Sequence, residues 1–259
     1  DMRRQSPLES RENAVQEAPV GYDEAKTFVH EKNLRYCITI EFIPDTGLLR
    51  MRDETLYAIT EKGERKKSRS AFLEKIGNRI HVRMEGRAHP AYYDTLLDHT
   101  ILSLPLYPPY YPHITALKTE ISQWRFFYFE PRERMRTANP MRETNAIGPM
   151  GDELAAFLHT LKKRNDNQYK AFLKAVHMIL PAIDTVDPNV NNLGEIELLI
   201  REQNTVISSR LVSEGTLRIL GLLAVANEIA PAPLIGLEEP ENGVHPRRLE
   251  LIAELLKNR

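Results

Sequence analysis

Two short segments near the end of the sequence carry the residue types that phosphate chemistry needs. In the first, Ser213, Gly215 and Thr216 stand directly before an apolar run with helical spacing. A serine in that place can cap the helix through its hydroxyl group, and the free N–H groups beside a small glycine can also bind an anion. Capping alone would explain Ser213, so this segment by itself leaves a structural role and a phosphate-binding role open.

The second segment is a short apolar run that ends in two acids. Residues 234–237 are bounded by prolines and are typical of a fully buried strand, and Glu238 and Glu239 follow at its carboxyl end. Ligands bind at this end of the strands in open α/β sheets. Two adjacent carboxylates repel each other unless a cation neutralises them, and Mg²⁺ accepts such oxygen ligands. Glu238 is therefore a candidate magnesium ligand and Glu239 a candidate base for water, against the simpler alternative of a solvated acidic turn.

Taken together, the two segments resemble the motifs of one ATPase family. Residues 211–218 are similar to the signature sequence of ABC-type ATPases, in the Ser-Glu-Gly-Thr-Leu-Arg form of the SMC/RecF-like and OLD-like members from bacteria and archaea. Residues 234–239 resemble the Walker B strand of that family, and residues 240–246 resemble its D-loop. One departure is that Glu238 replaces the commoner aspartate. In addition, Glu214 and Thr216 replace the glycine and glutamine of transporter signatures.

The resemblance implies a role for each matching residue. Ser213, Glu214, Gly215 and Thr216 would bind an ATP held by the opposite protomer, and Ser213 and Gly215 would contact its γ-phosphate. Glu238 would take the magnesium position and Glu239 that of the catalytic base. The D-loop residues that would lie at the dimer interface are Asn242, Gly243 and His245.

The fold that this resemblance implies is α/β, a P-loop NTPase-type ABC ATPase head with an antiparallel β-layer and a helical subdomain. We expect the head to be incomplete, because the 259 residues contain no Gly-x-x-x-x-Gly-Lys-Ser/Thr loop and no switch histidine after the D-loop. The implied activity is ATP binding and hydrolysis with Mg²⁺ by a dimer or higher oligomer of heads. The implied setting is DNA repair or antiphage defence, with DNA and a nuclease or effector protein as partners. The alternative is a hydrolysis-deficient clamp or scaffold for protein assembly.

Composition narrows the class of protein further. A formal net charge of -1 argues against a basic field over the whole chain, so nucleic acid would bind only through local patches. The single cysteine, Cys37, excludes an internal disulfide and a cysteine-based zinc site, and suits a reducing cytoplasm. We expect it to fill the core. No apolar stretch approaches the roughly 18 residues of a membrane span, so we expect no membrane partner.

The pattern along the chain predicts four regions. They are a polar linker or loop over 1–25, a β-rich part of the nucleotide-binding lobe over 26–90, a mostly helical subdomain over 91–190, and the signature, Walker B and D-loop portion over 191–259. The predicted strands are 36–42, 48–59, 79–84 and 126–129, and a hairpin follows within 193–206. The predicted helices are 91–104, 114–124, 151–161 and 166–181, with a rigid proline-rich connector at 105–112.

Two groups of basic residues have alternative interpretations. Arg132, Arg134, Arg136 and Arg142 could meet phosphates, but we favour salt bridges with the nearby acids Glu130, Glu133 and Glu143. The second group is most simply a solvated hairpin tip, with DNA backbone contact as its alternative, and consists of Lys62, Arg65, Lys66, Lys67 and Arg69. His159 and His177 have no partner at metal-ligand spacing, and we expect them to serve packing.

Overall fold

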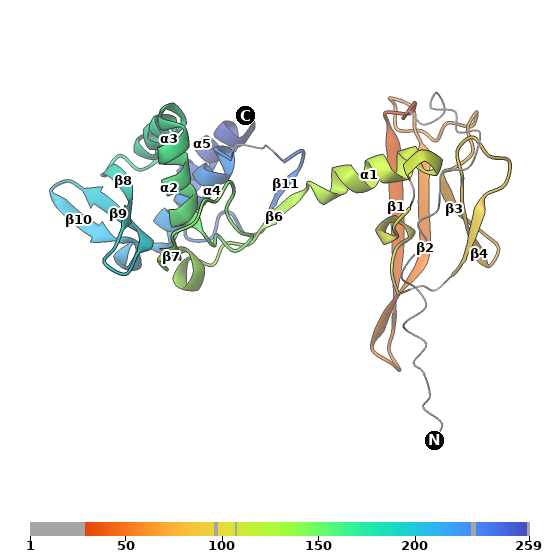
Figure 1. The fold of residues 1–259 in the computed structure, drawn as a ribbon, viewed down its shortest axis with the longest axis horizontal. Coiled ribbons are helices and arrows are strands. Elements are labelled where there is room, and N and C mark those ends of the chain that lie inside the picture. Colours follow the sequence, from red (N-terminus) through yellow and green to blue (C-terminus); the bar gives the residue numbers. More distant parts are fainter. Residues whose placement is uncertain (1–28, 96–97, 107, 229–231, 258–259) are drawn as a thin grey trace, which may run out of the picture. The chain divides into compact units, whose positions relative to one another are not determined.

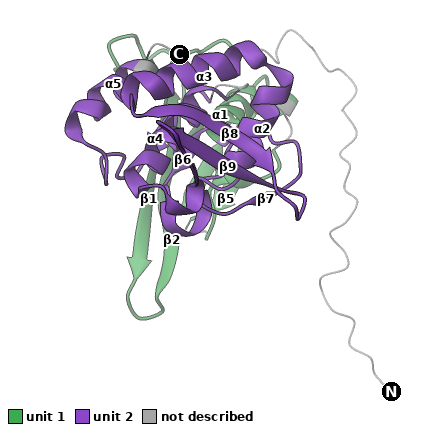
Figure 2. Cartoon of the chain, turned by 90° about the vertical axis from the view of Figure 1, so that its left-hand side faces the viewer, with its two compact units in different colours: residues 1–121 green, residues 122–259 purple. Residues whose placement is uncertain are grey.

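The computed structural model describes residues 29–95, 98–106, 108–228 and 232–257. The chain divides into two compact units, Asp1–Ile121 and Ser122–Arg259, which are coloured separately in Figure 2. Each has its own hydrophobic core. The predicted linker 1–25 lies outside the described residues. The predicted boundaries at 90 and 190 stay predictions.

The first unit is built on a five-stranded antiparallel sheet with the order β1-β2-β3-β4-β5 (Figure 1). The strands are β1 (Leu34–Ile43), β2 (Leu48–Ala58), β3 (Leu73–Ile76), β4 (Arg79–Val82) and β5 (Ala91–Asp94). Short helices η2 (Ile101–Ser103) and η3 (Pro108–Tyr110) precede helix α1 (Pro112–Ser122). Leu56, Val82 and Ile101 are fully buried in the core, and Ile114 brings the first turn of α1 into it. Apolar side chains at alternate positions of the strands explain why the sheet has one covered face.

Two buried polar side chains fasten the loops of this unit. His113, which is fully buried, accepts hydrogen bonds at Nε2 from the backbone N–H groups of His30 (3.2 Å) and Glu31 (3.0 Å). Its Nδ1 lies 2.7 Å from a carboxylate oxygen of Glu85, and its ring stacks on Phe72. Glu54 accepts hydrogen bonds from the Tyr36 hydroxyl and from the first N–H groups of η2. These carboxylates are satisfied structurally, as buried charges require.

The second unit combines helices with two small sheets. Strands β8 (Ile183–Val190), β9 (Glu195–Glu202), β10 (Thr205–Ser208) and β7 (Asn139–Pro140) form an antiparallel sheet in which β8, β10 and β7 all pair with β9. Strands β6 (Arg125–Phe127) and β11 (Ile235–Leu237) form a parallel pair. The helices are the π-helix η4 (Pro131–Met135), α2 (Leu154–Arg164), α3 (Asp166–Ile179), the 3₁₀ turn η5 (Ser209–Leu211), α4 (Glu214–Ala226) and α5 (Pro246–Lys257).

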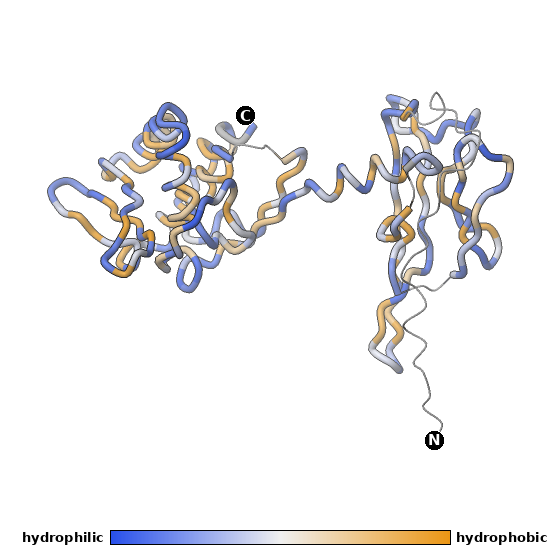
Figure 3. The backbone as a smooth tube through the Cα atoms, in the orientation of Figure 1, coloured by the Kyte–Doolittle hydropathy of each residue, from blue (hydrophilic) through white to orange (hydrophobic). Residues whose placement is uncertain are grey.

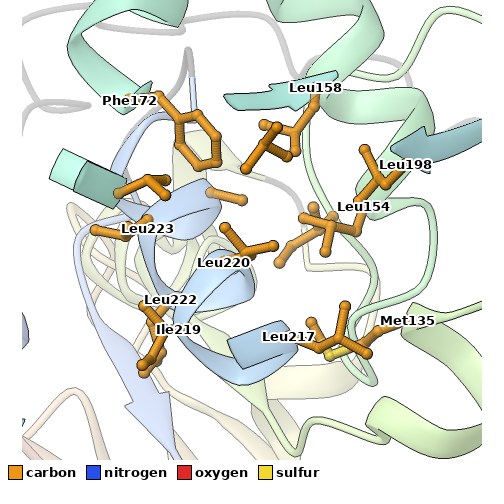
Figure 4. Packing of buried hydrophobic residues seen from close by; sticks show 14 of the residues in the cluster. Met135, Leu154, Leu158, Phe172, Leu198, Leu217, Ile219, Leu220, Leu222 and Leu223 are labelled. Atoms are coloured by element: carbon orange, nitrogen blue, oxygen red, sulfur yellow. The ribbon is translucent and has the colours of Figure 1, made fainter. Parts of the chain in front are cut away.

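Helix α4 is the centre of this unit. Its residues 217–225 are all buried, and Leu217, Leu220 and Leu223 lie in one cluster with Met135 of η4, Leu154 of α2 and Phe172 of α3 (Figure 4). A helix that is apolar on every side has to be surrounded by protein, so the periodicity of the sequence after Ser213 is explained by its central position. No helix in the described ranges has the length and apolar character needed to cross a membrane.

Most of the predicted elements are confirmed, but one predicted helix and the predicted place of Cys37 are wrong, and one strand was missed. Residues 91–104 were expected to be helical but form β5 and the short η2, because β5 completes the sheet by pairing with β4. The strand β8 was not predicted. Cys37 is exposed rather than a core filler, since it lies on the polar side of β1.

The basic loop between β2 and β3 lies within a hairpin, as expected. Lys66 and Arg69 both pair with Glu31, at 2.6 and 3.2 Å, and Arg65 pairs with Glu74 at 3.0 Å. Three of the five basic side chains of the loop are therefore neutralised within the unit.

Candidate functional site

The first part of the site is the start of α4. Ser213 is its N-cap: the Oγ accepts a hydrogen bond from the N–H of Thr216 (3.1 Å) and donates one to Thr216 Oγ1 (2.8 Å). The predicted cap is confirmed. Glu214 occupies the first turn, where a negative charge interacts favourably with the helix dipole. Ser213 is exposed and Gly215 is buried, so the hydroxyl faces solvent while the glycine lies against protein.

Two arginines from far back in the sequence hold this helix start in place. Arg132 Nε lies 2.5 Å from Glu214 Oε1, and this hydrogen bond holds the pKa of the Glu214 carboxyl below its ordinary value. Arg136 Nη2 donates to the Val212 carbonyl (2.8 Å), and Ser209 Oγ donates to the Arg136 carbonyl (3.2 Å). The segment before α4 is thus pinned at both ends to η4 and the residue after it.

The arginine cluster forms salt bridges as favoured, but with other acids than expected. Arg132 pairs with Glu214, Arg134 with Asp152 at 3.7 Å, and Arg142 with Glu153. Glu143 pairs with Arg164 instead. The predicted partners were neighbours in the sequence, whereas folding brings Asp152 and Glu153, just before α2, and Glu214 of α4 closer. No local signal in the sequence marks Arg132 as a partner of the signature segment.

The second part of the site is the end of β11. Ile235, Gly236 and Leu237 pair in parallel with Arg125, Phe126 and Phe127, and the N–H of Glu238 donates to the Phe127 carbonyl (2.9 Å). The strand is only half-buried, so the expectation of a fully buried strand was wrong. Glu238 and Glu239 are both exposed, so water can hydrate the two carboxylates and screen the repulsion between them. Among the described residues no group of three or more His, Cys, Asp or Glu side chains is placed to hold a metal.

The strand β6 is itself anchored by a buried ion pair. Arg125 Nη1 lies 3.2 Å from Glu228 Oε2, its Nη2 donates to the Ile147 carbonyl (2.6 Å), and its guanidinium lies over the Phe127 ring. The carboxylate of Glu228 also accepts from the N–H of Ile147 (3.1 Å). This network fixes β6, and through β6 it fixes the strand that ends at Glu238.

Glu239 has an unusual backbone. Its φ is +45°, in the left-handed region that non-glycine residues rarely adopt. The other two non-glycine residues of this kind in the described ranges are Glu153, at the N-cap of α2, and Gln203, in the turn between β9 and β10. The Glu239 carbonyl accepts from the Asn242 N–H (3.1 Å), and its Oε2 accepts from Asn242 Nδ2 (3.3 Å). Strained residues of this kind are found preferentially at functional sites.

Residues 240–246, which resemble a D-loop and keep that name below, run from this turn into α5. Gly243 has φ +71°, and the Val244 N–H that follows donates to the Glu241 carbonyl (3.0 Å). His245 stands immediately before Pro246, and its Nδ1 accepts from the Arg247 N–H (3.3 Å), so it acts as a side-chain cap for α5. Proline in the first position of the helix is compatible with such a cap, because its missing N–H has no partner there in any case.

The two parts of the site touch each other within one chain. A Cβ atom built on Gly215 would lie 3.0 Å from the carbonyl carbon of Gly243 and closer still to its oxygen. Only glycine at position 215 therefore allows the start of α4 and the D-loop to pack this closely. The structure thus brings together Gly215 and Gly243, while Glu238 and Glu239 lie at the other end of the D-loop turn.

Comparison with known proteins gives one result. The sequence profile of the AAA_21 family, described as "AAA domain, putative AbiEii toxin, Type IV TA system", matches residues 111–259. The matched region contains the segments that resemble a signature, a Walker B strand and a D-loop, and makes up more than half of the chain. A search of curated proteins finds no match.

Proposed function

Because the chain belongs to the AAA_21 family of P-loop ATPases, we propose that it is part of an ATP-binding and ATP-hydrolysing head of the SMC/RecF-like type. Two such heads would close around ATP. The observation that carries the proposal is the contact between Gly215 and Gly243, since it joins the signature segment and the D-loop into one surface. Both segments are exposed beside that contact, as an ATP-dependent interface requires.

In this proposal Ser213 and Gly215 bind the γ-phosphate of the nucleotide on the opposite head. The exposed hydroxyl of Ser213 and the N–H groups at the start of α4 suit an anion, because the helix dipole is positive at this end. Glu214 and Thr216 line the same turn. Arg132 offsets the charge of Glu214 and so prevents it from repelling a phosphate.

Glu238 and Glu239 divide the remaining work. Glu238 follows β11 and offers the hard oxygen ligand that Mg²⁺ prefers, so its chemistry fits the ion that accompanies ATP. Bound there, the ion would supply charge neutralisation to the phosphates. Glu239 orients and deprotonates the attacking water, and its left-handed backbone and the bond from Asn242 hold its carboxylate in place. Asn242, Gly243 and His245 lie at the interface with the second head.

The decisive experiment compares Glu239→Gln with Glu241→Gln in protein expressed from the complete reading frame. Glu241 is an exposed acid of the same loop. It accepts a hydrogen bond from the Val244 N–H through its backbone carbonyl, which the substitution keeps, so Glu241→Gln is a matched control. A magnesium-dependent ATPase rate that falls at least about a hundredfold in the first variant only supports Glu239 as the base. Equal rates in both variants would refute it. A wild-type protein that binds no ATP would favour the clamp or scaffold for protein assembly.

A second variant tests the role of the signature in trans. Ser213→Asp keeps an N-cap side chain, so the stability of α4 should hardly change. It also places a negative charge where the γ-phosphate of the partner's nucleotide would lie. We expect the increase in mass that ATP induces, measured by light scattering before and after its addition, to be lost while circular dichroism shows that the protein stays folded. Dimerisation at the wild-type ATP concentration would contradict the proposed position of Ser213.

The biological setting is proposed on the family alone. Its description names a toxin of a type IV toxin–antitoxin system, and we propose antiphage defence or DNA repair in the cytoplasm, with a nuclease or effector protein as partner. An ATPase rate that responds to duplex DNA ends at low salt would favour repair. A rate that ignores DNA would favour a switch for a protein partner.

A further inference from the structure

Strand β1 is a long edge of the first unit's sheet. It pairs with β2 along one side, and among the described residues no strand pairs with its other side. An edge of ten residues presents unpaired N–H and C=O groups that can extend the sheet into another chain.

Apolar side chains stand at every even position of β1 from Leu34 to Phe42. The residues at even positions are Leu34, Tyr36, Ile38, Ile40 and Phe42, and those at odd positions between them are Arg35, Cys37, Thr39 and Glu41. The first two apolar residues pack against the core of the unit. The last three are 45%, 55% and 59% exposed, and Leu49, opposite Phe42 on β2, is 61% exposed. Figure 3 shows the hydrophobic colour along this end of the β1–β2 hairpin. The covered face of the sheet therefore continues into an uncovered apolar stripe, which we call the β1 stripe (Ile38, Ile40, Phe42 and Leu49).

We propose that a second copy of this chain pairs its β1 with this edge in the antiparallel direction, with Ile38 opposite Ile38, so that the two β1 stripes pack side by side on one face of a continuous sheet. When a strand pairs antiparallel with a copy of itself, the numbers of any two opposite residues add up to the same value, and this sum defines the register. A register with an odd sum would place each apolar side chain of β1 opposite a polar side chain of the other copy, on the same face of the sheet. Only even sums keep the apolar side chains together.

Charge selects one register among the even sums. With Ile38 at the two-fold axis, Arg35 of each copy lies opposite Glu41 of the other, and Tyr36 lies opposite Ile40. A shift of the axis to Cys37 or Thr39 leaves both charged residues opposite neutral ones. Opposite charges that lie directly across an antiparallel pair stabilise it, and the Arg35–Glu41 pair occurs twice in the dimer. The strand is thus complementary to itself, which favours a second copy over an unrelated partner.

The single cysteine of the chain allows this register to be tested directly. In the proposed pairing Cys37 lies opposite Thr39 of the other copy, at a distance that a disulfide can span. Two copies of Cys37 lie diagonally to each other, about 7–8 Å apart, which is too far. The variant C37S/T39C has its only thiol at position 39, where it is also diagonal to its own copy.

Oxidation without nucleotide should therefore give a covalent dimer only in a mixture of the wild-type protein and C37S/T39C. A covalent dimer of the wild type alone would overturn the register, because that product requires Cys37 opposite Cys37. Equal cross-linking in all three samples would mean random collision and would also overturn it. A protein that is monomeric in sedimentation and cross-links in none of the samples would refute the dimer altogether.

A charge reversal gives an independent readout. Arg35→Glu would place like charges opposite each other twice in the dimer, so the Kd for self-association should rise at least about tenfold. Arg52→Glu makes the same charge change on an exposed residue of the neighbouring strand and should leave the Kd unchanged. An equal effect of both variants would contradict the pairing. Because the assay contains no ATP, its failure would leave the proposed ATPase untouched.

Discussion

The contact between Gly215 and Gly243 gives the sharpest test of the site's geometry. In Gly215→Ala the new methyl group would meet backbone atoms of Gly243 at a separation that folded proteins do not show, so the D-loop or the start of α4 must move. Overpacking of this kind costs about 1–3 kcal/mol, and the higher helix propensity of alanine returns about 0.5–1 kcal/mol. We expect a net loss of about 1–2 kcal/mol in the free energy of unfolding of the second unit.

The assay for this prediction is urea denaturation followed by tryptophan fluorescence. Trp124 is the single tryptophan of the chain and lies in the second unit, so its signal reports the unfolding of that unit. With an m value of about 2 kcal/mol per molar urea, the midpoint should fall by roughly 0.5–1 M.

Gly221→Ala is the matched control for Gly215→Ala. It lies in the same helix and gains the same propensity, but its methyl group would meet side chains instead of backbone, the Met135 terminal methyl at 2.7 Å and the Phe129 ring at 3.0 Å. The flexible Met135 side chain can move aside, and the Phe129 ring needs to shift by only a few tenths of an ångström. Its midpoint should fall less than that of Gly215→Ala. A Gly215→Ala protein as stable as the wild type would refute the close packing of the signature segment on the D-loop.

Two further predictions concern ionic contacts. Arg125→Met should lower the free energy of unfolding of the second unit by about 3 kcal/mol, because it removes the guanidinium from the buried Glu228 carboxylate. Lys162→Met, which breaks an exposed pair with Asp187, should lower it by less than about 1 kcal/mol. Urea denaturation measures both losses, and equal losses would contradict the role of burial. Glu31→Gln should destabilise the first unit near neutral pH, because the hydrogen bond from Lys66 lowers the pKa of Glu31 below its ordinary value of 4.5. The stabilisation by the ionised carboxylate is present above pH 4.5 and is lost as the pH falls through the lower pKa of the folded state. Thermal unfolding followed by circular dichroism should show the wild type and the variant converging in acid, and a difference that persists there would count against the prediction.

Local signals in the sequence predicted local structure well. The hydroxyl cap of Ser213 and the period of 166–181 depend only on residues within a few turns, so both could be predicted without knowing the rest of the fold. The helical spacing of 91–104 misled, because pairing with β4 outweighs a weak helix preference. Strand β8 was missed because it contains Pro188, and its pairing with β9 alone explains why a proline is tolerated there.

The contacts that define the site could not be predicted in the same way. Arg132 and Glu214 are 82 positions apart, and nothing in the type or spacing of either residue names the other. The contact of Gly215 with Gly243 depends on how α4 and the D-loop pack, which periodicity does not determine. The motifs identified the candidate segments, whereas the bonds that position those segments come from the tertiary fold.

The buried imidazole of His113 has a consequence for how the first unit folds. Its bonds to the backbone of His30 and Glu31 span 83 and 82 positions, and they close a loop that contains the entire five-stranded sheet. Contacts of such long sequence separation form late, because the entropy of closing the loop must be offset by structure already in place. We therefore expect residues 29–31 to join the unit only after the strands between them and α1 have assembled, with the amide protons of His30 and Glu31 among the last to become protected from exchange.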